Sequence, residues 1–542
     1  MTNTKKKTWF RPEIIIPILL IVSFLVWLLL FLLERGHGLQ SDIFFQRLND
    51  FLADATNVTG YTSADDPYFN TDYQGLEEKA YPPLTYVFMY LMSRVVNIVP
   101  YREVQFFLPI YYNPAWMMLY LLGTVVTALF VYEIIRTAVV GSENQKRLTA
   151  VAMMLTFGML FTMERGNTLI LTIGFVCLYL FWYDSESALK REVAIMSLGV
   201  AAAFKLSPAL LGLLLIYDRR WLQAVRCALY GVFFIFAPFA AIEGGFANIP
   251  QWISNIRANV DSYKDIKSGV SLQNTVFYIR QFLTGSADNN QALYSACRIV
   301  AIVLALVILA GGFFVCFKWE QVLMVSAVVT FYPAHSGKYN ILYLLPAFIM
   351  LLNAYASRNA GEKDEVPLRN WENIILLVAF FLLNQDVQLP EKYMWFSYIC
   401  MVPLIALLCA VKVIRAGVVF AVNRKSVPEE SMTEEARPLV NAYAGHVDAA
   451  RQAVDNRYAE ALRHVEVTSQ SVKERAELQH RAEEEAKRIL GSEGQQQIDA
   501  ERERHEQELE RLNAQRKAHE EEMRRIKEEE ELVRQMREES KN

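Results

Sequence analysis

The sequence predicts an all-α protein with about 10–12 membrane-spanning helices, followed by a long charged helical tail. Two observations lead to this fold class. Hydrophobic residues make up 53% of the 542 residues and gather in repeated apolar runs over residues 1–425. Residues 426–542 consist mostly of Glu, Arg, Lys, Gln and Ala. The net charge of −4 therefore averages over two unlike parts, which we take as two domains.

The first apolar run, Ile14–Leu33, follows three lysines and Arg11. A run of roughly 20 residues crosses the ~30 Å hydrocarbon core. A cleaved signal peptide would have a shorter apolar region followed by small residues, whereas this run ends in Glu34-Arg35-Gly36. We therefore expect a retained anchor with a cytoplasmic N-terminus.

Further apolar runs predict the remaining membrane helices, and some are shorter than a full span, which is tolerated where neighbours bury them. They lie at residues 115–135, 148–163, 168–183, 192–204, 207–217, 222–242, 299–317, 321–332, 341–354, 373–384 and 393–414. The run at 84–99 contains Arg94 and Asn97. It is therefore interpreted as a helix along the membrane interface.

Crossings counted from the N-terminus place connections rich in Lys and Arg in the cytoplasm, as the positive-inside bias requires. These connections are residues 136–147, 183–192, 217–221, 318–320 and 357–371. The opposite face receives a first loop, residues 34–84, a later loop, residues 243–298, and several short turns. Both termini are predicted to be cytoplasmic, in a multi-pass protein of the cell membrane.

Ionisable residues return repeatedly to this outer face. They are Asp42, Arg165, Lys205, Arg280, His335 and Lys338. Ionisable groups at helix ends in a membrane protein are costly and suggest a functional site. The alternative is that Arg165 and Lys205 extend to the lipid headgroups. Several cations opposite one acidic loop favour a site for an anionic substrate.

A lipid-linked phosphate fits the cations, because Arg and Lys both bind phosphate oxygens. A carboxylate can take the proton of an attacking hydroxyl, and cations stabilise a leaving phosphate. The pattern predicts glycosyl transfer from a polyprenyl-phosphate sugar. Neither a GxGxxG nor a GxxxxGK[ST] motif occurs, so no nucleotide-binding domain is expected. The six cysteines lack CxxC spacing and no HExxH occurs, so neither a metal nor a cofactor is expected.

Six short motifs follow one another along the outer side. They are Ser41-Asp42-Ile43-Phe44, Ala80-Tyr81-Pro82-Pro83-Leu84, Glu164-Arg165-Gly166-Asn167-Thr168, Phe204-Lys205-Leu206-Ser207-Pro208, Gln273-Asn274-Thr275 with Arg280, and the stretch PAHSGKY at 333–339. With them the chain resembles the GT-C glycosyltransferases, especially the bacterial polyprenyl-phosphate-mannose-dependent α-1,2-mannosyltransferases of glycosyltransferase family 87. Asn167 departs from the glutamine of the family's RGQ turn, and the late His region is rearranged. The donor sugar or the acceptor could differ there.

The resemblance implies an inverting hexosyltransferase with its active site outside the cytoplasm and Asp42 as general base. Asp50, Asp54, Asp65, Asp66 and Asp72 are alternatives in the same loop. The donor phosphate would be bound by Arg165, Lys205, Arg280, His335 and Lys338, with support from Glu164, Asn167, Tyr81 and Asn274. The implied donor is a polyprenyl-phosphate sugar, by default mannose. The implied acceptor is a glycolipid or glycan within membrane lipids.

Two other functions remain open. A lipid-carrier flippase or transporter would also need a basic outer cavity, but it would more often show repeated halves. A lipid-linked polysaccharide polymerase or ligase would depend on a long late loop. The aromatic residues of loop 243–298 either stack on acceptor sugars or pack at the membrane surface. They are Trp252, Tyr263, Phe277, Tyr278 and Phe282.

The tail, residues 426–542, has heptad-like apolar spacing after residue 508, but Arg516, His519 and Glu530 occupy positions in the apolar seam. A coiled coil and a solvated single helix with Glu–Lys and Glu–Arg pairs therefore both remain open. We expect the tail to serve self-association or to bind a cytoplasmic protein. Nucleic acid is not an expected partner.

Overall fold

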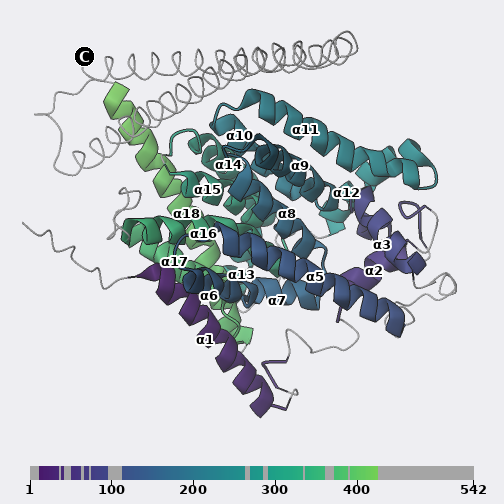
Figure 1. The fold of residues 1–542 in the computed structure, drawn as a ribbon, viewed down its shortest axis with the longest axis horizontal. Helices are drawn as coiled ribbons and strands as arrows, with labels where there is room; N and C mark the ends of the chain where they lie inside the picture. Colours follow the sequence, from purple (N-terminus) through teal and green to yellow (C-terminus); the bar gives the residue numbers. More distant parts are fainter. Residues whose placement is uncertain are drawn as a thin grey trace, which may run out of the picture. The chain divides into compact units, whose positions relative to one another are not determined.

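The structure is a computed structural model that describes residues 11–35, 38–41, 51–62, 66–71, 75–95, 113–262, 269–284, 291–315, 317–333, 336–359, 371–388 and 391–424. These residues form helices and turns and contain no strand, which confirms the all-α prediction for them (Figure 1). By its contacts the chain divides into Met1–Ile414 and Arg415–Asn542. The tail at 426–542 lies outside the described residues. The coiled coil and the solvated single helix therefore both stay predictions for it.

Most of the helices fall on the predicted apolar runs, but the structure adds helices at residues 53–61, 249–262 and 272–284 that no run predicted. In chain order they are α1 (Pro12–Leu33), α2 (Ala53–Tyr61), η2 (Leu76–Glu78), α3 (Pro83–Val95), α5 (Pro114–Ala138), α6 (Glu143–Met154), α7 (Phe157–Glu164), α8 (Leu169–Trp182), α9 (Ala188–Phe204), η4 (Ser207–Gly212), α10 (Leu213–Tyr217), α11 (Trp221–Phe236), η5 (Ala237–Ala241) and η6 (Gly245–Asn248). They continue with α12 (Ile249–Ser262), α13 (Leu272–Thr284), α14 (Gln291–Gly311), α15 (Lys318–Phe331), η8 (Lys338–Leu344), α16 (Leu345–Asn359), α17 (Trp371–Asn384) and α18 (Glu391–Arg424).

Among the described residues, five helical stretches are long and apolar enough to cross a membrane. They are Pro12–Leu33, Pro114–Ala138, Trp221–Ala241, Lys338–Arg358 and Cys400–Val418. A sixth span results if α6 and α7, which meet at a bend of 52°, are one broken helix. Four more apolar helices are shorter, at 10–17 residues. Fewer of the described helices are long enough to cross a membrane than the 10–12 that were predicted, because several apolar runs end early at turns.

The short helices lie between longer neighbours. Helix α8 packs against α5 on one side and α9 on another, and α9 packs against α11 (Figure 1). The side chains of Ile173, Val176 and Tyr179 on α8 are fully buried. A helix of 14 residues is too short to span alone, so its burial by neighbours explains how it is tolerated.

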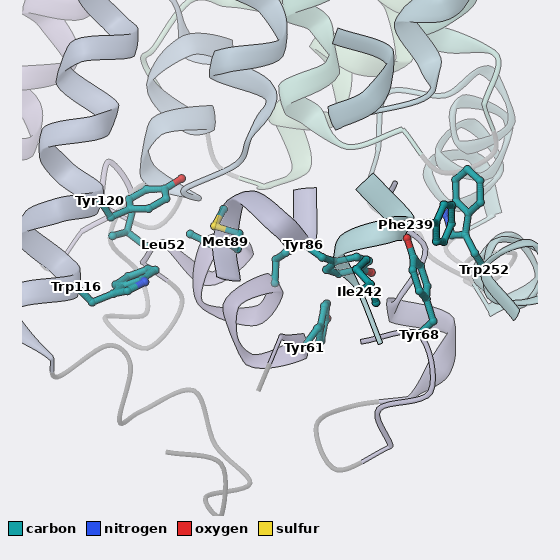
Figure 2. Packing of buried hydrophobic residues seen from close by; sticks show 12 residues of the cluster. Leu52, Tyr61, Tyr68, Tyr86, Met89, Trp116, Tyr120, Phe239, Ile242 and Trp252 are labelled. Atoms are coloured by element: carbon teal, nitrogen blue, oxygen red, sulfur yellow. The ribbon is translucent and has the colours of Figure 1, made fainter. Parts of the chain in front are cut away.

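The described parts of the first loop fold into a cap with an aromatic core. Figure 2 shows Tyr61 and Tyr68 of the loop in one cluster with Tyr86 of α3, Phe239 of η5 and Trp252 of α12. The rings of Tyr68 and Phe239 lie 5.5 Å apart, and those of Phe239 and Trp252 lie 5.6 Å apart. Each buried aromatic side chain removes about 150–250 Å² from water. Tertiary packing thus orders a loop whose sequence is largely polar.

Helix α12 of the later loop completes this cap. Trp252 Nε1 donates to the carbonyl of Ala80 at 3.2 Å, and Asn255 Nδ2 donates to the carbonyl of Tyr68 at 3.0 Å. Trp252 is 4% exposed, so it packs inside the cap and does not offer its face to an acceptor sugar. Tyr263 and the side chains of Phe277, Tyr278 and Phe282 lie outside the described part.

Candidate functional site

Helix α7 ends in a turn that contains one residue in the left-handed (αL) backbone conformation. Gly166 has a φ of +64°, a conformation that costs other L-residues energy. The amide of Asn167 donates to the carbonyl of Thr162 at 3.0 Å and the amide of Gly166 to that of Met163 at 3.0 Å. Asn167 Oδ1 then accepts from the amide of Leu169 at 2.9 Å, an Asx turn that leads into α8. The turn therefore ends one helix and begins the next.

Helix α2 of the first loop docks on this turn. The amide of Leu52 donates to the carbonyl of Glu164 at 2.8 Å, and the amide of Asp54 donates to that of Arg165 at 2.9 Å. Two amides at the start of α2, which lack partners within their own helix, thus receive them from the end of α7. Leu52 has a φ of +54°, a left-handed conformation that costs about 1 kcal/mol or more. Tertiary docking, not local preference, holds this loop in place.

Docking brings the carboxylate of Asp54 to the side chains of the turn. Arg165 Nη2 lies 3.0 Å from Asp54 Oδ1, and Asn167 Nδ2 donates to Asp54 Oδ2 at 2.6 Å. The Asp54 and Arg165 side chains are 17% and 22% exposed. Both carboxylate oxygens therefore have a fixed partner in a site that solvent reaches only in part. The hydroxyl of Tyr120 on α5 donates to the carbonyl of Gly166 and secures the turn from the other side.

The Lys205 ammonium lies near this carboxylate. Lys205 follows the last residue of α9, and its Nζ is 4.5 Å from the centre of the Tyr339 ring. Burial lowers the pKa of Lys205 to about 8, and the Asp54 carboxylate opposes this shift. Among the described residues, Lys205 makes this cation–π contact but no ion pair. It is thus a partly buried cation available to an anion.

Tyr81 and Tyr339 belong to the same neighbourhood. Burial raises the pKa of Tyr81 well above its usual value, and the negative charges of Asp54 and ionised Tyr339 add to that shift. The Tyr339 ring also stacks on Phe161 of α7, with ring centres 6.3 Å apart. Tyr339 therefore lies between α7 and Lys205, and Tyr81 lies within the electrostatic reach of Asp54.

The motif at Gln273-Asn274-Thr275 meets the late motif through backbone contacts. The amide of Val270 donates to the carbonyl of Ser336 at 2.9 Å. A Cβ on Gly269 would lie 2.6 Å from that carbonyl oxygen and 2.7 Å from Asn274 Nδ2. The start of α13, with Asn274, thus lies beside the segment that leads into η8 and Tyr339.

The structure gathers part of the predicted set. Arg165, Asn167, Lys205 and Tyr81 lie around Asp54, one of the five alternative carboxylates of the first loop. Asn274 lies beside Ser336, Lys338 begins η8, and Arg280 lies further along α13. Asp42 and His335 lie outside the described residues, so their predicted roles stay predictions. Glu164 contributes its backbone carbonyl to Leu52, while the observed ion pair of Arg165 is with Asp54.

The sequence reasoning missed two features of the site. One is the cation–π contact between Tyr339 and Lys205, which no local pattern indicates because the two residues lie far apart in the chain. Asp54 stands in the first turn of α2, but helix α2 itself was not predicted. Its docking partner lies more than a hundred residues further along the chain.

Replacing Gly166 by Ala should destabilise the protein by about 1–3 kcal/mol and lower its activity. The positive φ disfavours any Cβ, and the new atom would lie 2.9 Å from Ala55 Cβ and 3.2 Å from Leu52 Cα. Both neighbours belong to the docked start of α2, so the strain would displace Asp54. The measurement is the apparent Tm in detergent together with the transfer rate. Gly123→Ala, with no atom near its new Cβ, is the matched control, and an unchanged Tm for Gly166→Ala would contradict the prediction.

One of three comparisons with known proteins found a match. The family model described as glycosyltransferase family 87 matches residues 80–336. No curated protein and no solved structure matches the chain. The matched segment contains Tyr81, the Arg165 turn, Lys205, Asn274 and Ser336, and Asp54 lies before it. Within the described residues, no group of three or more His, Cys, Asp or Glu side chains could hold a metal ion. The match over residues 80–336 supports the predicted resemblance to glycosyltransferase family 87.

Proposed function

We propose that this membrane glycosyltransferase moves a hexose, by default mannose, from a polyprenyl-phosphate donor to a glycolipid or glycan acceptor. The transfer takes place at the extracytoplasmic face and inverts the anomeric centre. The observation that supports a lipid-phosphate donor best is Lys205, a partly buried cation held over the Tyr339 ring, near Asp54 but in no described ion pair with it.

In this proposal Asp54 acts as the general base. It takes the proton of the acceptor hydroxyl while that oxygen attacks the anomeric carbon of the donor. The bond from that carbon to the phosphate oxygen breaks, and its electron pair stays on the phosphate. A carboxylate oxygen accepts at two lone pairs, so the contacts to Arg165 and Asn167 leave room for the acceptor hydroxyl. Those two side chains orient the base.

Lys205 is the main ligand of the leaving phosphate in this scheme. Its ammonium offers three donors, and a positive charge near the leaving oxygen stabilises charge that develops as the bond breaks. Arg165 directs Nη2 to Asp54, so we assign it first to positioning the base and only second to the phosphate. Lys338, Arg280 and His335 remain candidates for the outer phosphate oxygens.

Asp42 remains the rival base. It stands one residue beyond Ser41, whose hydroxyl donates to the carbonyl of Gly38 at 2.7 Å. The family match favours glycosyl transfer over the flippase alternative. A polymerase or ligase would share the lipid-linked donor but differ in its acceptor, so acceptor analysis separates it from the proposed enzyme.

The donor class is tested with the full-length protein in lipid nanodiscs. One reaction receives polyprenyl-phosphate-[³H]mannose and another receives GDP-[³H]mannose, each with extracted membrane lipids as acceptor. We expect labelled product from the polyprenyl donor and none from the nucleotide sugar. Transfer from the nucleotide sugar would contradict the proposal. Polyprenyl-phosphate donors that carry other sugars then identify the sugar if mannose is not transferred.

A further inference from the structure

Asp386 is a buried carboxylate that the proposed chemistry does not use. It lies in the connection between α17 and α18, is 0% exposed, and neither of its carboxylate oxygens accepts a hydrogen bond. Two residues earlier, Asn384 is 1% exposed. Its Nδ2 donates to the carbonyl of Phe380 at 3.1 Å, but its Oδ1 accepts nothing. Three buried acceptor atoms therefore stand within three consecutive residues without a donor.

Such a group is expensive, because an ionised carboxylate buried without a partner loses its hydration and gains nothing in return. Elsewhere the fold supplies a counter-charge. Lys412 Nζ lies 2.6 Å from Glu320 Oε1 and 3.6 Å from Glu372 Oε2. The described residues give Asp386 no such cation. Burial raises the pKa of Asp386 to about 8, so the carboxyl group either holds a proton or binds a cation that the described residues do not supply.

The surrounding hydrogen bonds hold the carboxylate in place. The Asp386 amide donates to Ser23 Oγ, midway along α1, at 2.9 Å. The Gln388 amide donates to Gln40 Oε1 at 2.8 Å, and Gln40 Nε2 donates to the carbonyl of Gln388 at 2.9 Å. These bonds form a clamp between the connection 385–388 and the segment 38–41. The nearby amide donors are thus already used.

The Ser23 hydroxyl adds a fourth oxygen. It lies within hydrogen-bond distance of the Asp386 backbone, and an oxygen that accepts one hydrogen bond keeps a second lone pair. Carboxylate, amide and hydroxyl oxygens are the ligands that hard cations prefer. A proton on Asp386 supplies a single donor, whereas a bound cation is shared by several oxygen ligands.

We propose that Asp386, Asn384 and Ser23 bind a monovalent cation, such as Na⁺, where α1 meets the α17–α18 connection. A single carboxylate neutralises one positive charge, and a divalent ion would leave a net charge buried. The bound ion stabilises the clamp between Gln40 and Gln388. That clamp fixes the start of the first loop, two residues before Asp42, so the ion supports the loop that carries the proposed base without depending on that base's role.

The test is the apparent Tm of the purified full-length protein in detergent. NaCl is raised from micromolar to molar concentration while choline chloride keeps the ionic strength constant. A ligand that binds only the folded state stabilises it in proportion to the logarithm of its concentration once the site is half full. The wild-type Tm should therefore rise by a constant step with each tenfold increase of Na⁺.

Two variants separate the site from general salt effects. Asp386→Asn keeps the shape of the side chain but removes its charge, and its Tm should not depend on Na⁺. Asn384→Ala should shift the rise to higher Na⁺ concentration. Asp66→Asn, at a partly exposed carboxylate in the first loop, should respond as wild type does. An identical wild-type Tm in NaCl and choline chloride overturns the proposal, as does an unaltered Na⁺ response of Asp386→Asn.

Discussion

Replacing Asp54 by Asn should lower the rate of sugar transfer by a factor of about 10²–10⁴, the usual contribution of a general base. Asparagine has the size of aspartate and still offers an oxygen to Arg165, so the docking of α2 on the Arg165 turn should survive. What it lacks is a basic carboxylate lone pair that can take the acceptor proton. The measurement is kcat at saturating donor and acceptor, with the apparent Tm as a check on folding.

Two further variants make this result decisive. Asp42→Asn tests the carboxylate that the sequence favoured. Asp66→Asn tests a further alternative, and it should fold, because Asp66 Oδ1 accepts from the amide of Tyr68 at 3.0 Å, a role that the amide oxygen of asparagine can also perform. A wild-type rate for a folded Asp54→Asn protein would remove Asp54 as the base. Loss of transfer in Asp42→Asn alone would then support the sequence-based choice.

The helices were predictable because their signal is local. Each of the runs 168–183 and 192–204 is apolar over its own length, and they form α8 and α9 within a few residues of the expected ends. The fold of the first loop was not predictable in this way. Its anchor is the bond from the Leu52 amide to the Glu164 carbonyl, and no pattern near Leu52 indicates that partner.

The candidate site was predicted in part for a related reason. The sequence places Arg165, Lys205 and Asn167 at helix ends on one predicted side of the membrane. The structure brings these three residues together. Which charge pairs with which depends on tertiary docking. Arg165 was expected to bind phosphate with support from Glu164, and the structure also pairs it with Asp54. Docking places Asp54 beside Arg165 and Asn167, whereas Asp42 lies outside the described residues, so the choice between these two carboxylates rests on the Asn variants.

Replacing Lys205 by Met should lower kcat/KM for the donor by a factor of about 10²–10³, which is typical for removal of one group that stabilises developing charge. Methionine keeps the apolar stem and its packing against the Tyr339 ring, so the loss should reflect the missing charge. The measurement is the initial rate over a range of donor concentrations. A kcat/KM within a factor of two of wild type would show that Lys205 does not bind the phosphate.

The pH dependence offers a sharper test of the same role. Burial lowers the pKa of Lys205 to about 8, so the free enzyme carries the charge below this pH and loses it above. Because the donor phosphodiester stays anionic throughout, kcat/KM of wild type should fall about tenfold per pH unit above pH 8. A bound phosphate raises the pKa of the lysine, so kcat itself should fall only at higher pH. Lys205→Arg keeps its charge in this range, and its kcat/KM should stay level between pH 8 and 9.5. If both proteins lose activity in parallel, the titrating group is not Lys205.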